Sequence, residues 1–104
     1  MTAPTLSVSR PVVEELIRLA ALEVSGVVRV GPGGPRWRTL VAGAPVASRI
    51  DDGRVSVRIS IVARPGHALV PLTRQVRAAV TGAIERLVGL EVDEVVVLVD
   101  GVGA

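Results

Sequence analysis

The feature that most restricts the fold of this chain is a pair of alternating segments around the dipeptide Asp52-Gly53. On both sides of it, a mostly aliphatic set of side chains alternates with a polar or small set. An Asp-Gly pair between two such segments is a strong signal for a β-hairpin. With this dipeptide at the centre of the turn, Ile50 pairs with Val55, and the aliphatic side chains of both strands share one face. We expect that face to pack on a core and the other to meet water or a partner.

A helix is predicted before the hairpin, because apolar residues recur at spacings of three and four between residues 10 and 24. Ser9 is suited to cap its N-terminus, and Pro11 is suited to its first turn. Gly26 is expected to end the helix in the left-handed conformation that glycine adopts readily. Residues 27–30, which are mainly valine, suggest a brief strand.

The same helical spacing returns between residues 69 and 87, after Pro65-Gly66 ends the second arm of the hairpin. Gly82 would lie inside this helix, where glycine costs about 1 kcal/mol relative to alanine, and a close approach to the sheet would explain its presence. Gly89 is well placed to cap the C-terminus. Five consecutive aliphatic residues, 95–99, predict a last strand that is covered on both faces.

This order of elements predicts an α+β fold, a two-layer sandwich in which two helices pack on one face of a small mixed sheet of three to four strands. The length of 104 residues favours a single domain over residues 1–104. Glycines and prolines are concentrated in residues 31–35, so a flexible loop is expected at about 31–44. If the last strand is parallel to residues 54–62, the connection through the helix should be right-handed.

Composition excludes several kinds of site. The chain has no cysteine, one histidine (His67) and one aromatic residue (Trp37), while valine occurs 22 times. Disulfides, thiolate metal sites, cysteine nucleophiles and sites that need two imidazoles are therefore ruled out. All 12 basic residues are arginine, set against 10 acidic ones, for a net charge of +2. The high calculated pI follows from the absence of lysine and tyrosine, so it does not predict nucleic-acid binding.

No catalytic site is evident in the sequence. Asp51-Asp52 belongs to a turn and Asp93-Glu94 to a strand entrance, so neither pair resembles the two carboxylates of an acid–base cleft. Motifs of nucleophile elbows and phosphate-binding loops are missing. We therefore expect no enzyme, no catalytic residue, no cofactor and no metal. A small enzyme is the least favoured alternative, and turnover that is lost on His67→Ala would support it.

The uncovered face of the sheet is a candidate contact surface. It would carry Ser56, Arg58 and Ser60, and beside them either Val96 and Leu98 or their alternates on the last strand. An apolar strip on an uncovered face suggests a protein contact, most simply a homodimer. The alternative is that the loop at 31–44 folds over this strip.

A second hypothesis concerns nucleic acid. Gly31-Pro32-Gly33-Gly34 matches the Gly-x-x-Gly of KH domains, although that loop should join two helices and this one follows a predicted strand. Arg36, Trp37 and Arg38 interleave phosphate-binding and base-stacking chemistry. A KH-like domain would bind less at high salt and after Trp37→Ala. Balanced charge makes a nucleic-acid partner the less favoured reading.

Taken together, these segments resemble the bacterial alkaline shock protein family, also called the envelope stress response family. The resemblance covers nearly all of residues 5–102 except the loop at 31–44. The matching stretches are residues 6–17, 20–27, 55–61 and 89–99, with Val76, Val80 and Ile84 in the second helix. The sequence departs from the family at Arg64-Pro65-Gly66, where an aromatic residue usually precedes the glycine, and at Ser25, where proline is common.

The resemblance implies a small, non-enzymatic, cytoplasmic protein linked to envelope or alkaline stress. Such proteins act through protein–protein contacts, often near the membrane through a membrane-anchored partner. No apolar segment reaches 18 residues and no signal peptide is apparent, so direct membrane insertion is not expected. We expect a protein partner and a homodimer or larger assembly. The candidate interaction residues are Arg36, Trp37, Arg38, Arg58, Val96 and Leu98.

Overall fold

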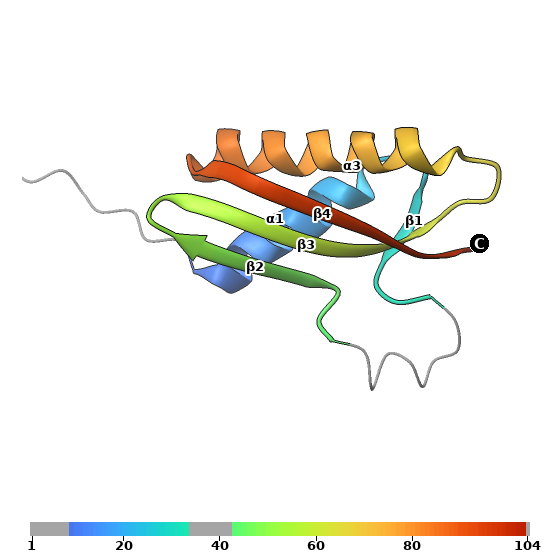
Figure 1. The fold of residues 1–104 in the computed structure, drawn as a ribbon, viewed down its shortest axis with the longest axis horizontal. Coiled ribbons are helices and arrows are strands. Elements are labelled where there is room, and N and C mark those ends of the chain that lie inside the picture. Colours follow the sequence, from blue (N-terminus) through green and yellow to red (C-terminus); the bar gives the residue numbers. More distant parts are fainter. Residues whose placement is uncertain (1–8, 34–42, 104) are drawn as a thin grey trace, which may run out of the picture.

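The computed structural model describes residues 9–33 and 43–103, and it confirms the predicted α+β fold. Two helices pack on a mixed four-stranded sheet (Figure 1). The elements in chain order are α1 (Arg10–Leu22), β1 (Val27–Val30), β2 (Val46–Asp51), β3 (Arg54–Ala63), α3 (Leu69–Ala83), the π-helical turn η1 (Ile84–Val88) and β4 (Glu91–Val102).

The sheet is built around β3, the strand that pairs with each of the other three. The long strand β4 runs parallel to β3 along one side, and β2 and then β1 lie antiparallel along the other (Figure 1). Ser60 marks the junction between β2 and β1. Its N–H donates to the Pro45 carbonyl, and its own carbonyl accepts from the Gly31 N–H, both at 2.9 Å. The sheet is therefore three strands wide along its length.

The hairpin forms in the predicted register, with Ile50 opposite Val55 and Val46 opposite Ile59. At the centre of its turn, Asp52 has φ 51° and Gly53 has φ 75°. Two consecutive positive φ angles define the type I′ turn, whose twist matches that of the flanking strands. The sequence signal and the local backbone thus agree.

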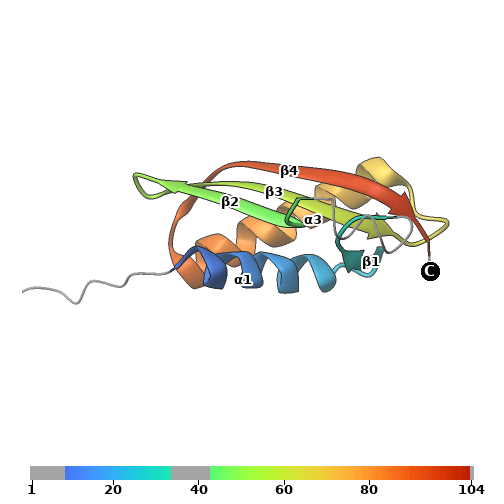
Figure 2. The same cartoon turned by 90° about the horizontal axis from the view of Figure 1, so that it is seen from below.

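The core lies between the helices and one face of the sheet, and it is aliphatic throughout (Figure 2). On the sheet side, Val55, Ile59 and Ile61 are 0% exposed. They pack against the buried faces of both helices. The buried helical residues are Val13, Ile17, Ala20 and Ala21 of α1 and Leu72, Val76, Val80 and Ala83 of α3. Helical spacing and strand alternation therefore identified the residues that fill this core.

The last strand differs from its prediction. β4 is parallel to β3, but it is longer than residues 95–99, and among the described residues helices cover only one of its faces. Val95 is 6% exposed and packs on the helices, whereas Leu98 is 36% exposed on the opposite face. The run of aliphatic residues therefore leaves apolar side chains on a face over which no helix of the described residues lies (Figure 2).

Of the three glycines to which a role in a helix was assigned, Gly89 has the predicted role, whereas Gly26 and Gly82 do not. Gly89 caps η1 with φ 77°. Gly26 does not cap α1, which ends at Leu22, and it lies outside the left-handed region. A Cβ at Gly26 would lie 2.6 Å from Leu72 Cδ1 and 2.9 Å from His67 Nδ1. Gly26 is therefore needed for the close approach between the start of β1 and the start of α3.

Gly82→Ala is expected to stabilise the protein. The predicted close approach of Gly82 to the sheet is wrong, because the nearest atom to its Cβ position is in the Arg86 guanidinium at 3.9 Å. Alanine should raise the free energy of unfolding by about 1 kcal/mol, since it restricts the unfolded chain and favours helix. The thermal midpoint, followed by circular dichroism, should rise by roughly 4–8 °C. A lower midpoint would contradict the open space seen beside this residue.

Candidate interaction surface

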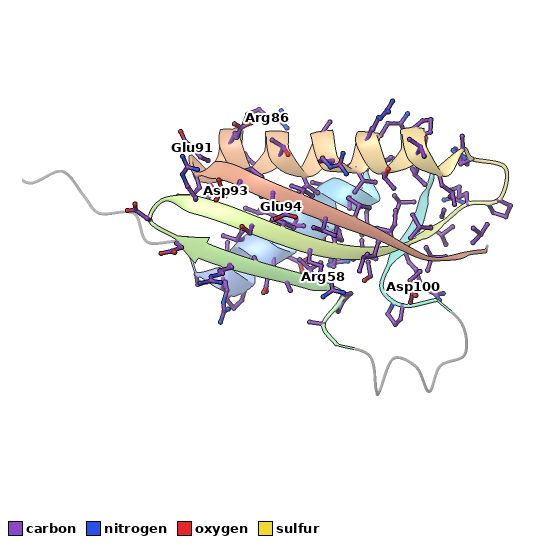
Figure 3. The ribbon with its side chains drawn as sticks, in the orientation of Figure 1. Arg58, Arg86, Glu91, Asp93, Glu94 and Asp100 are labelled. Carbon is purple, nitrogen blue, oxygen red and sulfur yellow. The ribbon has the colours of Figure 1, made fainter. Side chains whose placement is uncertain are left out.

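On the sheet face opposite the helices, eight neighbouring side chains from three strands form the surface that we call the open face. In register across the sheet they form three rows. The rows are Arg49, Ser56 and Glu94; Ala47, Arg58 and Val96; and Ser60 and Leu98. Figure 3 shows Arg58 and Glu94 on the side of the sheet that faces the viewer. In Figure 2 the helices lie below the sheet, on its other side.

Three of the predicted site residues meet on this face. Arg58 lies directly opposite Val96, and Leu98 follows one row along. The sequence left open whether Val96 and Leu98 or their alternates would face outward. A bulge decides this: Val55 pairs with Val92 but Ser56 pairs with Glu94, so Asp93 is an extra residue on β4. The predicted residues Arg36, Trp37 and Arg38 lie outside the described residues.

The open face is hollowed around Arg58. A shallow hollow of about 290 Å³ is lined by Ala47, Ser48, Arg49, Ser56, Val57, Arg58, Glu94 and Val96. A neighbouring one of about 360 Å³ is lined by Pro32, Gly43, Ala44, Pro45, Ala47, Arg58, Ser60 and Asp100. Arg58 borders both hollows, so its guanidinium stands at the centre of the surface.

The charged groups of the open face are available for a partner. In the part of the chain that the structure describes, Arg49, Arg58 and Glu94 make no hydrogen bond or ion pair through their side chains. At the hairpin end of the sheet, by contrast, an arginine is paired with two carboxylates. Arg54 Nη1 lies 2.7 Å from Asp93 Oδ1, and Arg54 Nη2 lies 3.6 Å from Glu91 Oε2. Sequence reasoning missed Arg49 and Glu94, since their place on this face depends on the register of three strands.

The start of the loop predicted at 31–44 crosses one end of the sheet. The Gly33 N–H donates to Asp100 Oδ2 at 3.0 Å, which connects the segment after β1 with the far strand β4. A Cβ at Gly33 would lie 2.2 Å from the Asp100 carbonyl oxygen, so the two backbones touch. Asp100 is a residue that sequence reasoning treated only as the end of the fold. Cover of the open face by residues 34–42 stays a prediction, because they lie outside the described residues.

Three of the acidic residues considered for chemistry, Asp51, Asp52 and Asp93, line one hollow of about 390 Å³ at the hairpin end of the sheet, together with Arg49, Arg54 and Ser56. Asp51 and Asp52 are exposed in the hairpin turn, as expected. Within residues 9–33 and 43–103, no three histidine or carboxylate side chains group in a way that could hold a metal ion. On α1, Arg18 Nε donates to Glu15 Oε2 at 3.1 Å. This hydrogen bond holds the pKa of the exposed Glu15 carboxylate below its usual value.

The two α-helices of the described residues do not combine the length and the apolar character that a membrane-spanning helix needs. α1 has 13 residues and α3 has 15. Neither is long and apolar enough to cross a bilayer, which needs about 20 apolar residues.

Solved structures of MamM CTD share this fold. The copper form has a TM-score of 0.65 at 20% identity and covers 88% of this chain and 85% of its own. A variant in a copper form has a TM-score of 0.64 at 20% identity, with coverage of 89% and 98%. A variant in a nickel form has a TM-score of 0.62 at 20% identity, with coverage of 88% and 96%. At this identity the likeness concerns the fold alone.

The family is identified from the sequence as a whole. A search of curated proteins finds no match. The model of the alkaline shock protein 23 family, described as having a cell envelope-related function, matches residues 2–104. This range includes every stretch on which the resemblance was based. The chain therefore belongs to the alkaline shock protein 23 family, whose function is related to the cell envelope.

Proposed function

We propose that this protein is a non-enzymatic interaction module of the cell envelope, which works through protein–protein contacts made by the open face. The observation that carries the proposal is the apolar pair Val96 and Leu98 beside Arg58, over which no helix or strand of the described chain lies. An exposed apolar strip with charged groups at its borders is the usual composition of a protein contact. The cell envelope-related function of the family supports this reading.

The partner that fits this surface is a protein with an apolar centre and an acidic group that can meet the Arg58 guanidinium. We place the chain in the cytoplasm beside the membrane, where a membrane-anchored partner holds it. This follows the resemblance, together with the finding that no helix of the described residues could span a bilayer. We also propose that the chain self-associates as a homodimer or a larger assembly.

The test is affinity co-purification from the native host, with and without nuclease, read by mass spectrometry. We expect one or a few membrane or envelope proteins whose recovery does not change with nuclease. Recovery of ribosomal or nucleoid proteins that disappear after nuclease treatment would overturn the proposal. That outcome would favour the KH-like alternative that depends on Arg36, Trp37 and Arg38.

A further inference from the structure

The outer edge of β2 offers unpaired backbone groups. The hydrogen bond from the Ser60 N–H to the Pro45 carbonyl fixes which groups of β2 face β3. Because these groups alternate along an antiparallel strand, Ala47 and Arg49 bond to β3, while Val46, Ser48 and Ile50 direct their N–H and C=O groups outward. The outward groups have no hydrogen-bond partner in the described chain. Figure 2 looks onto this edge, with α1 below it and no strand of the described residues along its outer side.

The opposite edge of the sheet is protected. The helix α3 runs beside β4 (Figure 1). From α3, the Arg77 side chain reaches the strand, and its Nε donates to the Val95 carbonyl at 3.2 Å. A covering helix and a charged side chain are the usual means by which a sheet avoids pairing with another chain. Within residues 9–33 and 43–103, α1 packs below β2, but no side chain donates to the outward carbonyl groups of this strand.

Ser48 supplies a second, independent observation. Its side chain is on the core side of β2 and is 8% exposed, and its hydroxyl has no hydrogen-bond partner among the described residues. Buried hydroxyl groups are nearly always paired, so an orphan at a strand edge needs an explanation. A second strand laid along this edge would bring a new polar group beside the hydroxyl.

We infer that two copies of this chain pair antiparallel along β2, with Ser48 opposite Ser48 of the second copy. In this register every outward N–H and C=O of Val46, Ser48 and Ile50 gains a partner. Val46 lies opposite Ile50 of the second copy, which joins apolar side chains on the core side. The two Ser48 hydroxyls lie side by side and can bond to each other.

Charge selects this register over its neighbour. In the inferred register, Arg49 lies opposite Ala47 of the second copy, so no like charges meet. One other antiparallel register pairs the same number of residues, and it places Arg49 opposite Arg49 of the second copy. Two cations directly opposite each other on one face repel, so this register is unfavourable. The inference rests on the proposed self-association. In the inferred dimer the two sheets form one continuous sheet, with both open faces on the same side, so neither open face is buried by the pairing.

Disulfide trapping tests the register, because the chain contains no cysteine of its own. Ala47→Cys and Arg49→Cys both place a thiol on the exposed side of β2. Across the inferred pair, residue 47 of one copy and residue 49 of the other have Cα atoms about 4.5 Å apart, within disulfide reach. Two copies of the same variant would have these atoms roughly 8 Å apart, which is too far.

We expect the mixture of the two variants to form a covalent dimer under a mild oxidant, seen on a non-reducing gel. Ala47→Cys alone should give at most a tenth as much, and it keeps the Arg49 charge that selects the register. Equal cross-linking of Ala47→Cys alone and of the mixture would overturn the inferred register. If light scattering shows a dimer at tens of micromolar and the mixture does not cross-link, the edge is wrong and self-association stands. A monomer at that concentration would overturn both.

Ser48→Ala provides a test that does not depend on cross-linking. Removal of an orphan hydroxyl should raise the thermal midpoint of the dilute monomer. In the dimer the same change removes the bond between the two hydroxyls, so the dimer dissociation constant should rise several-fold. A purely structural role for Ser48 would raise the midpoint and leave the dissociation constant unchanged. That result would contradict the pairing of Ser48 with its own copy.

Discussion

Ile59→Ala is expected to lower the free energy of unfolding by about 2–5 kcal/mol. Ile59 is 0% exposed in the middle of the central strand, on the side that both helices cover. Truncation removes buried methyl groups and leaves a cavity that the surrounding strands and helices can close only in part. Because a small domain is typically stable by about 5–15 kcal/mol, this loss is a large share of the total. Urea unfolding followed by circular dichroism measures it.

The matched control is Arg58→Ala, one residue earlier on the same strand. Arg58 is exposed on the open face and makes no bond with its side chain in the described chain. Its removal should change the free energy of unfolding by no more than about 0.5 kcal/mol. Similar losses for Ile59→Ala and Arg58→Ala would mean that both faces of the sheet are covered, contrary to the two-layer fold.

Leu98→Asp is expected to weaken binding of the envelope partner at least tenfold. Leu98 is 36% exposed at the border of the open face, where the proposed contact would bury it. A carboxylate placed in an apolar contact loses its hydration without gaining a partner, and a tenfold loss corresponds to about 1.4 kcal/mol. The partner recovered by co-purification, titrated against the purified variant, gives the dissociation constant.

Leu87→Asp is the control for Leu98→Asp. Leu87 is 64% exposed on η1, in the helical layer on the other side of the molecule. The same substitution there should leave partner binding unchanged, and both variants should keep thermal midpoints close to that of the original chain. If Leu87→Asp lost the partner and Leu98→Asp retained it, the contact would lie in the helical layer. A hollow of about 250 Å³ between α1, α3 and η1 would then be the candidate.

Local patterns determined most of the architecture. Asp52-Gly53 and its flanking alternation gave the turn and the pairing of Ile50 with Val55, because turn chemistry and strand period act over a few residues. Helical spacing located both helices and their buried faces for the same reason. The order of these segments was enough to suggest the family that the full-length match then established.

What the sequence by itself determined were the elements, the turn and the aliphatic side chains that form the core. Only the tertiary structure decided which valines of β4 face outward, because all five positions are aliphatic and a single extra residue, Asp93, reverses the assignment. It also decided the close approach at Gly26 and the contact of Gly33 with Asp100, which join segments far apart in the chain. Period and propensity describe neighbours along the chain, whereas the contents of a sheet face depend on how separate strands align.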